Sequence, residues 1–456
     1  MRYKNRLLIF LLVVMSSLFA SFSIQAQTCE GNVVTIDFTN VWGGERQPLM
    51  DDIIATFESQ NPCVDVINEV MPLDGYAEQI ATRLLSSDPP EVIMSARVQT
   101  YQFASEGRLQ SLSPYLEAAG IDVYDVFYDS EINNQMLDGE IWALPMPTAG
   151  GNTSFFFYNK DLVAQAGLDP EVGPQTWDDM ITLAEGVNKL DARGIEVIAT
   201  LPFSPDLNSS FAAWLASNGW QYLSDDGRQV LFNSERGVET LQWLIDYSNN
   251  YFGGFENMLD FFQDTDDNSA DFPFYQDTMA LWFGNTSQFN IIRTWDPDMY
   301  NDTDRWGVGL RPYNSAHPEA VSAGVNGLAF TWGYVIPASL PDDVKEAAFK
   351  WITFLAMDPE GGCQFVLAQN RPSPVRSCNE NPAYSSDNPY WDIVLEAFDH
   401  EVSLTITPVQ AQISDLVAQN IQAALLDTKT AEQALNDAAT AAQALLDDYW
   451  ASVDAK

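Results

Sequence analysis

The chain has few of the residues that most enzymes use as general bases or metal ligands. Its 456 residues include only 2 histidines and 4 cysteines. It has no Gly-x-Ser-x-Gly, His-Glu-x-x-His or phosphate-loop motif. Neither His317 nor His400 stands at metal-ligand spacing from a cysteine. The sequence therefore offers no assembled catalytic set and no metal site, and we expect no cofactor.

Basic residues are also scarce. The chain has 21 Lys and Arg against 64 Asp and Glu, a formal net charge of -43 at pH 7. A field of this sign repels nucleic acid and anionic lipid headgroups, so we expect no nucleic-acid partner. So many carboxylates also guarantee that some pairs lie close together, and paired carboxylates therefore carry no evidence for a glycosidase. The acidity fits a saline habitat or simple solubility.

Long apolar runs are absent after the first 26 residues. Those residues contain Arg2, Lys4 and Arg6, then LLIFLLVVMSSLFA, then a polar stretch ending in Ala26. This layout predicts a secretory signal peptide over 1 to 26 and a periplasmic or extracellular product. The QAQT before Cys29 lacks the small-residue pattern of a lipoprotein signal, which argues against lipid attachment at the cell surface.

The four cysteines predict disulfides, because an even number in an exported chain favours pairing. Four cysteines allow three connectivities. Cys363 and Cys378 would close a short loop, which contributes roughly 3 kcal/mol in the chain-entropy model. Cys29 and Cys63 would then join the starts of the first two predicted strands. Metal binding is the alternative, which the scarcity of histidine disfavours.

The first hundred residues of the exported chain alternate between strand and helix patterns. The segments in order are VVTIDFT (33 to 39), PLMDDIIATFESQNP (48 to 62), CVDVINEVM (63 to 71), YAEQIATRLLSS (76 to 87) and PEVIMSA (90 to 96). A β-α-β-α-β order predicts a parallel sheet with right-handed crossovers. Ligands of such sheets bind at the carboxyl ends of the strands, where WGGE and ARVQ stand.

The pattern restarts near residue 150. SFFFYN (154 to 159), TMALWFG (278 to 284) and RWGVGLRP (305 to 312) are typical of strands. PQTWDDMITLAEGVNKL (174 to 190) predicts a helix capped by Thr176. After WGYVIPAS the chain becomes helical at DDVKEAAFKWITFLAM, and Ala-rich amphipathic helices follow from about residue 408.

Aromatic residues are plentiful, with 13 Trp and 17 Tyr. Trp42, Trp282 and Trp332 stand beside glycine at predicted strand ends. A sugar ring stacks its C–H face on an aromatic ring, while its hydroxyls need amide, carboxylate or guanidinium partners. A single tryptophan is more often a core residue.

The acidic segment DTDDNSAD (264 to 271) lacks the glycine and the glutamate of a calcium loop, so we interpret it as a solvated loop.

Taken together, these motifs resemble the sugar-binding family of extracellular solute-binding proteins that serve ABC importers, the maltose and multiple-sugar type. The resemblance spans nearly the whole exported chain. It rests on the order of TIDFTNVWGGERQPLMDDIIATFESQNPCVDV, LLSSDPPEVIMSA, GRLQSLSPYL, DGEIWALPMPT, FFYNKDLVAQAGLDP, PQTWDDMITLAE, DTMALWFGN, WGYVIPAS, EAAFKWITFLAMDPEG and RPSPVR. It implies an α/β protein of two lobes, each a mainly parallel sheet flanked by helices, with the ligand held in a cleft between them.

The resemblance also implies lobe boundaries and a hinge. The first lobe would comprise 30 to 147 and 306 to 357, and the second 150 to 304 and 360 to 456. Gly150 and Gly151 suit a hinge, because glycine absorbs backbone rotation.

Family positions that contact sugars match residues from both lobes. The expected ligand-binding residues are Trp42, Gly43, Gly44, Glu45, Arg97, Gln99, Thr148, Trp214, Trp282, Asn285, Trp332, Gly333 and Arg376. Arg376 could instead form a structural salt bridge. This sequence departs from the family at two positions. Glu91 replaces an aspartate at the end of the third strand. Thr286 replaces an aromatic residue, and Trp282 lies on the other side of Gly284, which puts the stacking role of Trp282 in doubt.

We therefore expect a monomeric binding protein that captures a sugar or oligosaccharide and delivers it to membrane permease subunits without catalysis. Two alternatives remain open. The solute could instead be a polyamine, which suits the acidic composition, or a phosphorylated polyol. A secreted carbohydrate-active enzyme would use similar aromatic platforms but would release product.

Overall fold

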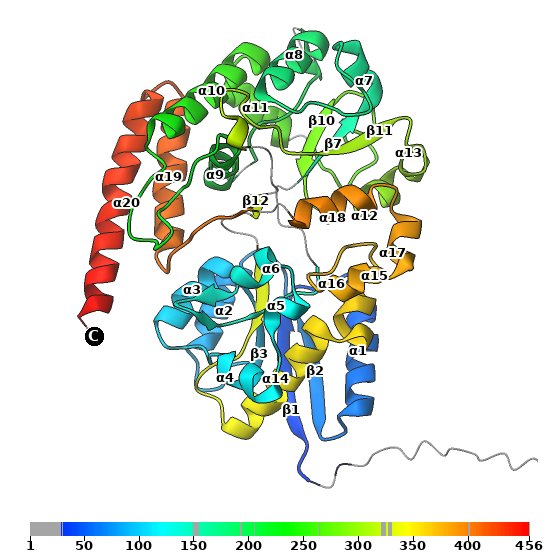
Figure 1. Ribbon diagram of the computed structural model, residues 1–456, viewed down its shortest axis with the longest axis vertical. Coiled ribbons are helices and arrows are strands. Elements are labelled where there is room, and N and C mark those ends of the chain that lie inside the picture. Colours follow the sequence, from blue (N-terminus) through cyan, green and yellow to red (C-terminus); the bar gives the residue numbers. More distant parts are fainter. Residues whose placement is uncertain are drawn as a thin grey trace, which may run out of the picture.

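The computed structural model describes residues 29, 31–148, 155–191, 194–204, 206–263, 265–320, 325–326, 331–399 and 402–455. They form two lobes, one above the other in Figure 1. The predicted signal peptide and the predicted hinge residues Gly150 and Gly151 lie outside the described residues. Within the described chain, no helix combines the length and apolarity needed to cross a membrane.

The first lobe, at the bottom of Figure 1, is built on a five-stranded sheet in the order β2-β1-β3-β13-β6. The strands are β1 (Val34–Asn40), β2 (Val64–Val70), β3 (Val92–Ala96), β6 (Leu144–Pro145) and β13 (Trp332–Val335). β1 is parallel to both β2 and β3, which confirms the parallel β-α-β-α-β unit predicted from the sequence. β13 returns from the far part of the chain and runs antiparallel to β3 and β6.

Helices cover this sheet with apolar stripes. In α1 the buried residues Met50, Ile53, Ile54 and Phe57 recur at helical spacing. Trp351 of α14 contacts Phe57 with ring centroids 5.1 Å apart. The helices around this sheet are α1 (Arg46–Gln60), α2 (Tyr76–Leu84), α3 (Arg97–Ser105), α4 (Ser113–Ala119), α5 (Val123–Val126), α6 (Asp129–Asn133) and α14 (Asp342–Met357). A short hairpin pairs β4 (Met136–Leu137) with β5 (Glu140–Ile141).

The second lobe contains a three-stranded sheet in the order β10-β7-β11. Its strands are β7 (Phe155–Asn159), β10 (Leu281–Gly284) and β11 (Trp306–Leu310). Both outer strands run antiparallel to β7, so this sheet is not parallel as the family resemblance implied. Every residue of β7 is buried, as its continuous apolar pattern predicts for a central strand.

The position of β11 corrects one predicted lobe boundary. Residues from 306 onward were assigned to the first lobe, but β11 pairs along its whole length with β7 of the second. Gly307 and Gly309 explain this pairing, because a side chain at either position would overlap the rings of Tyr158 and Phe156. The chain therefore returns to the first lobe only after β11.

The remaining helices follow β7, and most of them enclose the second sheet, although Phe365 packs on Trp42 of the first lobe. They are α7 (Lys160–Gln165), α8 (Trp177–Val187), α9 (Leu207–Ser217), α10 (Glu235–Phe252), α11 (Phe255–Gln263), α12 (Ser287–Trp295), α13 (Pro297–Tyr300), α15 (Gln364–Leu367), α16 (Arg376–Asn379), α17 (Pro382–Asp387), α18 (Trp391–Asp399), α19 (Gln410–Leu425) and α20 (Ala431–Asp454). Thr176 caps α8 in a capping box with Asp179, as predicted. The Ala-rich pair α19 and α20 packs on α9 and α10. Two further small sheets pair β8 (Lys189–Asp191) with β9 (Gly194–Val197), and β12 (Val325–Asn326) with β14 (Val402–Ser403).

Both expected disulfides are present. Cys29 pairs with Cys63, with Cα atoms 4.9 Å apart, and Cys363 pairs with Cys378, with Cα atoms 5.5 Å apart. The segment closed by the second disulfide contacts the first lobe, since Val375 bridges to Phe127. The predicted start of the second lobe at residue 360 therefore falls within a stretch that contacts the first lobe.

Candidate functional site

One end of each sheet faces the other lobe. Thr148 lies seven residues before Phe155, which opens β7, so the chain passes from one lobe to the other between them. Phe155 pairs with Gly284 and Leu310, which places the ends of β10 and β11 at this junction. In the first lobe the corresponding end holds Ala96 and Trp332, which pair in register.

The first-lobe end contains buried polar atoms without partners. Among the described residues, no hydrogen-bond partner reaches Gln99 Oε1, Asn134 Oδ1 and Nδ2, Gln135 Oε1 or Thr148 Oγ1. Gln135 donates to the Trp332 carbonyl at 3.4 Å, which fixes its position beside β13. A buried polar atom that lacks a partner costs about 1–3 kcal/mol. This end of the lobe is therefore suited to a ligand rich in hydroxyl groups.

Arg97 belongs to the same end. It begins α3 directly after β3, and its backbone N–H donates to the Thr331 carbonyl at 2.7 Å. Its guanidinium donates to the Leu404 carbonyl at 2.8 Å and lies 5.1 Å from the centre of the Tyr101 ring. The Nε atom has no partner among the described residues. Arg97 thus ties the first lobe to the segment that follows β14 and keeps one donor available.

The loop that follows β1 divides into a buried ring and an exposed tip. Trp42 is only 2% exposed, and its Nε1 donates to the Tyr334 hydroxyl at 2.9 Å. Gly44 and Glu45 are exposed, and Gly44 adopts a left-handed conformation with φ of 63°. Gly43 packs against Val70. In this conformation Trp42 is a core residue beneath the loop, while the loop tip carries the accessible groups.

Trp332 and Gly333 also differ in their accessibility to a ligand. Trp332 is partly exposed and packs its ring on Tyr76, with centroids 5.9 Å apart. Gly333 lies between β3 and β6, and a side chain there would strike Gln135 and Ala143. Trp332 is therefore available to a ligand at the lobe junction, whereas Gly333 serves close packing of the sheet.

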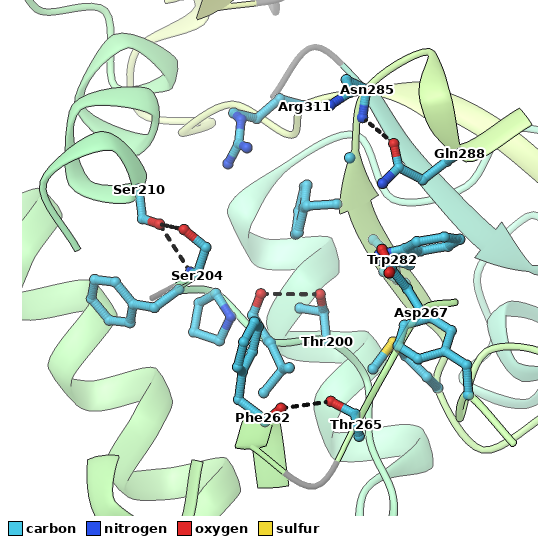
Figure 2. A pocket seen from close by; sticks show the side chains of 18 of the residues that line it. Thr200, Ser204, Ser210, Phe262, Thr265, Asp267, Trp282, Asn285, Gln288 and Arg311 are labelled. Atoms are coloured by element: carbon cyan, nitrogen blue, oxygen red, sulfur yellow. Dashed lines mark hydrogen bonds between the residues drawn. The ribbon is translucent and has the colours of Figure 1, made fainter. Parts of the chain in front are cut away.

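The second-lobe end contains a cavity of about 480 Å³, shown in Figure 2. Its walls come from the loop before α9, α9 itself, the segment after α11, β10 and the residue after β11. They are lined by Thr200, Leu201, Pro202, Phe203, Ser204, Ser209, Ser210, Trp214, Phe262, Thr265, Asp266, Asp267, Phe272, Met279, Leu281, Trp282, Phe283, Gly284, Asn285, Gln288 and Arg311. Such a mixture of rings and separated polar groups is typical of small-molecule sites.

Three predicted residues, Trp214, Trp282 and Asn285, line this cavity. The Trp214 ring is fully buried, and its Nε1 donates to the Pro202 carbonyl at 2.7 Å. Trp282 is 8% exposed and lies toward the cavity in Figure 2. The backbone N–H of Asn285 donates to Gln288 Oε1 at 2.7 Å, and the absence of a side chain at Gly284 leaves room for that amide.

Arg311 supplies the cavity with a positive charge. The guanidinium is held between two rings, 4.8 Å from the centre of Trp214 and 4.6 Å from that of Phe283. Burial lowers the pKa of Arg311 to about 9, and the side chain remains protonated at neutral pH. Asp267 lies on another wall, where burial, with a contribution from Asp266, raises the pKa of its carboxyl. The cavity therefore presents both a cation and acidic acceptors.

Two other predictions concern charged residues. Arg376 donates to the Phe127 carbonyl at 3.0 Å and forms an ion pair with Asp129 at 2.9 Å. This arrangement favours the structural salt bridge over a ligand contact. Thr265, Asp266 and Asp267 of the acidic segment line the cavity. Among the described residues, no group of three or more His, Cys, Asp or Glu could hold a metal ion.

Sequence reasoning missed several polar residues at these two ends. Arg311, Gln288, Ser204 and Ser210 line the cavity, and Ser204 and Ser210 bond through their hydroxyls at 3.0 Å. Arg311 was accessible to prediction, because it directly follows a strand that ends in glycine and leucine. Asn134, Gln288, Ser204 and Ser210 carry no local sequence pattern that marks them as site residues.

Comparison with known proteins agrees with this architecture. Residues 43–360 match the model of the family described as bacterial extracellular solute-binding protein. The sn-glycerol-3-phosphate-binding periplasmic protein UgpB of Escherichia coli (strain K12) is 23% identical over 343 residues, which cover 73% of this chain and 72% of the relative.

Solved structures share the fold. The ABC transporter solute-binding protein of Thermotoga lettingae, bound to α-D-tagatose, has a TM-score of 0.70 at 23% identity and covers 91% of this chain and 100% of its own. The sugar-binding protein MalE of Xanthomonas citri has a TM-score of 0.74 at 16% identity and covers 93% of this chain and 100% of its own. The chain belongs to the family of bacterial extracellular solute-binding proteins.

Proposed function

We propose that this protein binds a sugar or oligosaccharide between its two lobes and delivers it to the permease subunits of an ABC importer. The observation that carries this proposal is the pairing of two complementary surfaces at the lobe junction. One is the ring-lined cavity of the second lobe, and the other is the set of unpartnered buried polar atoms of the first. A sugar needs both kinds of surface, because its ring faces are apolar and its edges carry hydroxyls.

Lobe closure would supply the affinity and the signal. A ligand held by the cavity would bring hydroxyls to Gln99, Asn134 and Thr148 when the lobes approach, and each completed hydrogen bond would favour the closed state. The permease would then recognise the closed form. In this mechanism no bond of the ligand breaks, and the protein acts as a monomer outside the cytoplasm.

A phosphorylated polyol is the second candidate ligand. Curated relatives of this chain are described as binding sn-glycerol 3-phosphate. The buried guanidinium of Arg311 at the cavity wall suits an anionic group. This candidate preserves the binding-protein function and changes only the chemical class of the ligand.

Isothermal titration calorimetry of the exported chain tests the proposal. The panel contains monosaccharides, linear oligosaccharides and glycerol 3-phosphate, and we expect saturable binding of at least one of them. Chromatography of the recovered ligand should return it unmodified. Absence of binding across the whole panel, or release of shorter sugars from an oligosaccharide, would refute the proposed function.

A further inference from the structure

Most arginines of the described chain pair with carboxylates, and Arg97 instead donates to the Leu404 carbonyl. Seven form ion pairs with carboxylates, namely Arg83, Arg108, Arg228, Arg236, Arg293, Arg305 and Arg376. Arg46 and Arg371 do not: among the described residues, neither guanidinium has a carboxylate within ion-pair distance or a hydrogen-bond acceptor. In a chain with 64 acidic residues, this isolation is selective.

Arg46 and Arg371 lie in the same neighbourhood. The Arg46 guanidinium is 5.1 Å from the centre of the Trp42 ring. That ring packs edge-to-face on Phe365 of α15, with centroids 5.2 Å apart. Arg371 follows the same helix, and its backbone N–H donates to the Val366 carbonyl at 3.0 Å. The loop after β1 and the segment after α15 therefore bring two unpaired cations to one place.

This place is at the junction of the two lobes. Asn370, the neighbour of Arg371, donates to the hydroxyl of Tyr300 at 2.7 Å, and Tyr300 belongs to α13 of the second lobe. Arg46 is the first residue of α1 in the first lobe. A group bound between these arginines would thus lie beside this contact between the two lobes.

The electrostatics at this place favour an anion. Arg371 is partly exposed, but its Nε is enclosed and has no partner among the described residues. Burial lowers the pKa of Arg371 to about 10, and repulsion from Arg46 acts in the same direction. The N-cap of α1 is the exposed Glu45, whose side chain forms no cap hydrogen bond, and the first turn holds no acidic residue, so the backbone N–H groups of the helix start add to the positive charge of the arginines. Buried charges are normally paired, because removing them from water is costly.

We infer that Arg46 and Arg371 bind an anionic group of the transported ligand, a phosphate or a carboxylate. The ligand class is then a sugar or polyol that carries an acid group, and the guanidinium fork is suited to bind such a group through two parallel hydrogen bonds. This inference rests on the proposed function, since it assigns a chemical class to the ligand of the same interlobe site.

Matched ligand pairs test the inference by calorimetry on the full exported chain. The pairs are glycerol with sn-glycerol 3-phosphate, and glucose with glucose 6-phosphate and with glucuronate; inorganic phosphate is a further arm. We expect at least one acidic member to bind about tenfold to a hundredfold more tightly than its neutral counterpart. Equal or weaker binding of every acidic member overturns the inference. Inorganic phosphate that binds as tightly as the best acidic ligand also overturns it, because the arginines would then hold a free ion.

Substitutions separate a ligand-binding arginine from a structural one. Arg371→Gln should remove the preference for the acidic ligand, whereas Arg108→Gln, which breaks an exposed ion pair with Glu106, should leave it unchanged. Arg371→Lys should restore part of the preference, since it keeps the charge and loses the fork. An unchanged preference in Arg371→Gln, in a protein that still unfolds cooperatively, overturns the assignment.

The unliganded protein gives a second measurement. Because the enclosed Nε of Arg371 has no partner among the described residues, Arg371→Gln should leave the melting temperature unchanged or raise it. A marked fall would show that Arg371 holds the structure together and would overturn the assignment. Tight binding of neutral sugars alone would overturn this inference but not the proposed function. Absence of binding in both panels would overturn both.

Discussion

Trp42 and Trp282 lie at corresponding places in the two lobes and are used differently. Each stands near the end of a strand that faces the other lobe. Trp42 is buried beneath its loop, with its N–H bonded to Tyr334, whereas Trp282 forms part of a cavity wall. In the first lobe the Trp42 ring is part of the core, and several buried polar atoms have no hydrogen-bond partner among the described residues. The second lobe arranges its rings around open space.

This difference suggests a division of labour. A ligand ring can enter the second lobe without any rearrangement, because the cavity is already formed. The polar atoms of the first lobe have no partners among the described residues, so a ligand that reached them would supply those partners. Initial capture would then depend on the second lobe, and closure on the first. Substitutions in each lobe can test this division of labour.

Trp42→Ala should damage the fold more than the site. The substitution removes a large buried ring and leaves the Tyr334 hydroxyl without its donor, so the free energy of unfolding should fall by about 3–5 kcal/mol. Urea denaturation measures the loss. Trp295→Ala is the control, since Trp295 is 40% exposed, and it should cost about 1 kcal/mol or less. Equal effects of the two would contradict a core role for Trp42.

Arg311→Met should act on binding. Methionine fills the space between Trp214 and Phe283 without a charge, and ligand affinity should fall about tenfold to a hundredfold through loss of charged hydrogen bonds. The control is Arg305→Met near the opposite end of β11, where Arg305 pairs with Asp277 and Asp296. Calorimetry on both variants measures the difference. Full affinity in Arg311→Met would remove Arg311 from the site.

Asn134→Leu should stabilise the unliganded protein and weaken binding. Asn134 is fully buried and neither amide atom has a partner among the described residues, so an apolar side chain of similar size should raise the free energy of unfolding by about 1 kcal/mol. Asn40 is the matched control, because it is equally buried but bonds to Phe38, Trp42 and Asn68. Asn40→Leu should lower stability. A loss of stability in both variants would show that Asn134 already has a structural partner.

Much of the fold was predictable because it depends on local patterns. The β-α-β-α-β unit follows from alternating strand and helix periodicity, and the start of α8 follows from its cap at Thr176. The pairing of β11 was not predictable in this way. It depends on Gly307 and Gly309 fitting against Tyr158 and Phe156, which are about 150 residues away in sequence.

The site was predictable only in part for the same reason. A tryptophan beside glycine marks a strand end, but the pattern does not say whether the ring turns inward, as in Trp42, or lines a cavity, as in Trp282. The sequence also does not show which charged residues form ion pairs. Arg376 has a carboxylate in Asp129, whereas Arg371, five residues earlier, has none among the described residues.

The smallest predicted effect concerns pH and the acidic wall of the second-lobe cavity. Burial, with a contribution from Asp266, raises the pKa of Asp267 in the folded protein above its unfolded value of about 3.9. The folded state therefore holds this proton more tightly, and the resulting stability is present below pH 4 and is lost as pH rises through the raised pKa. Asp267→Asn should remove this dependence and make the variant slightly more stable than the parent at pH 7.5, by less than about 1 kcal/mol because solvent screens the partly exposed carboxyl. Urea unfolding of both proteins at pH 4 and pH 7.5 measures this difference, with Asp271→Asn at an exposed position as the control. A stability difference that is the same at both pH values would show that the pKa of Asp267 is not raised by its position on this wall.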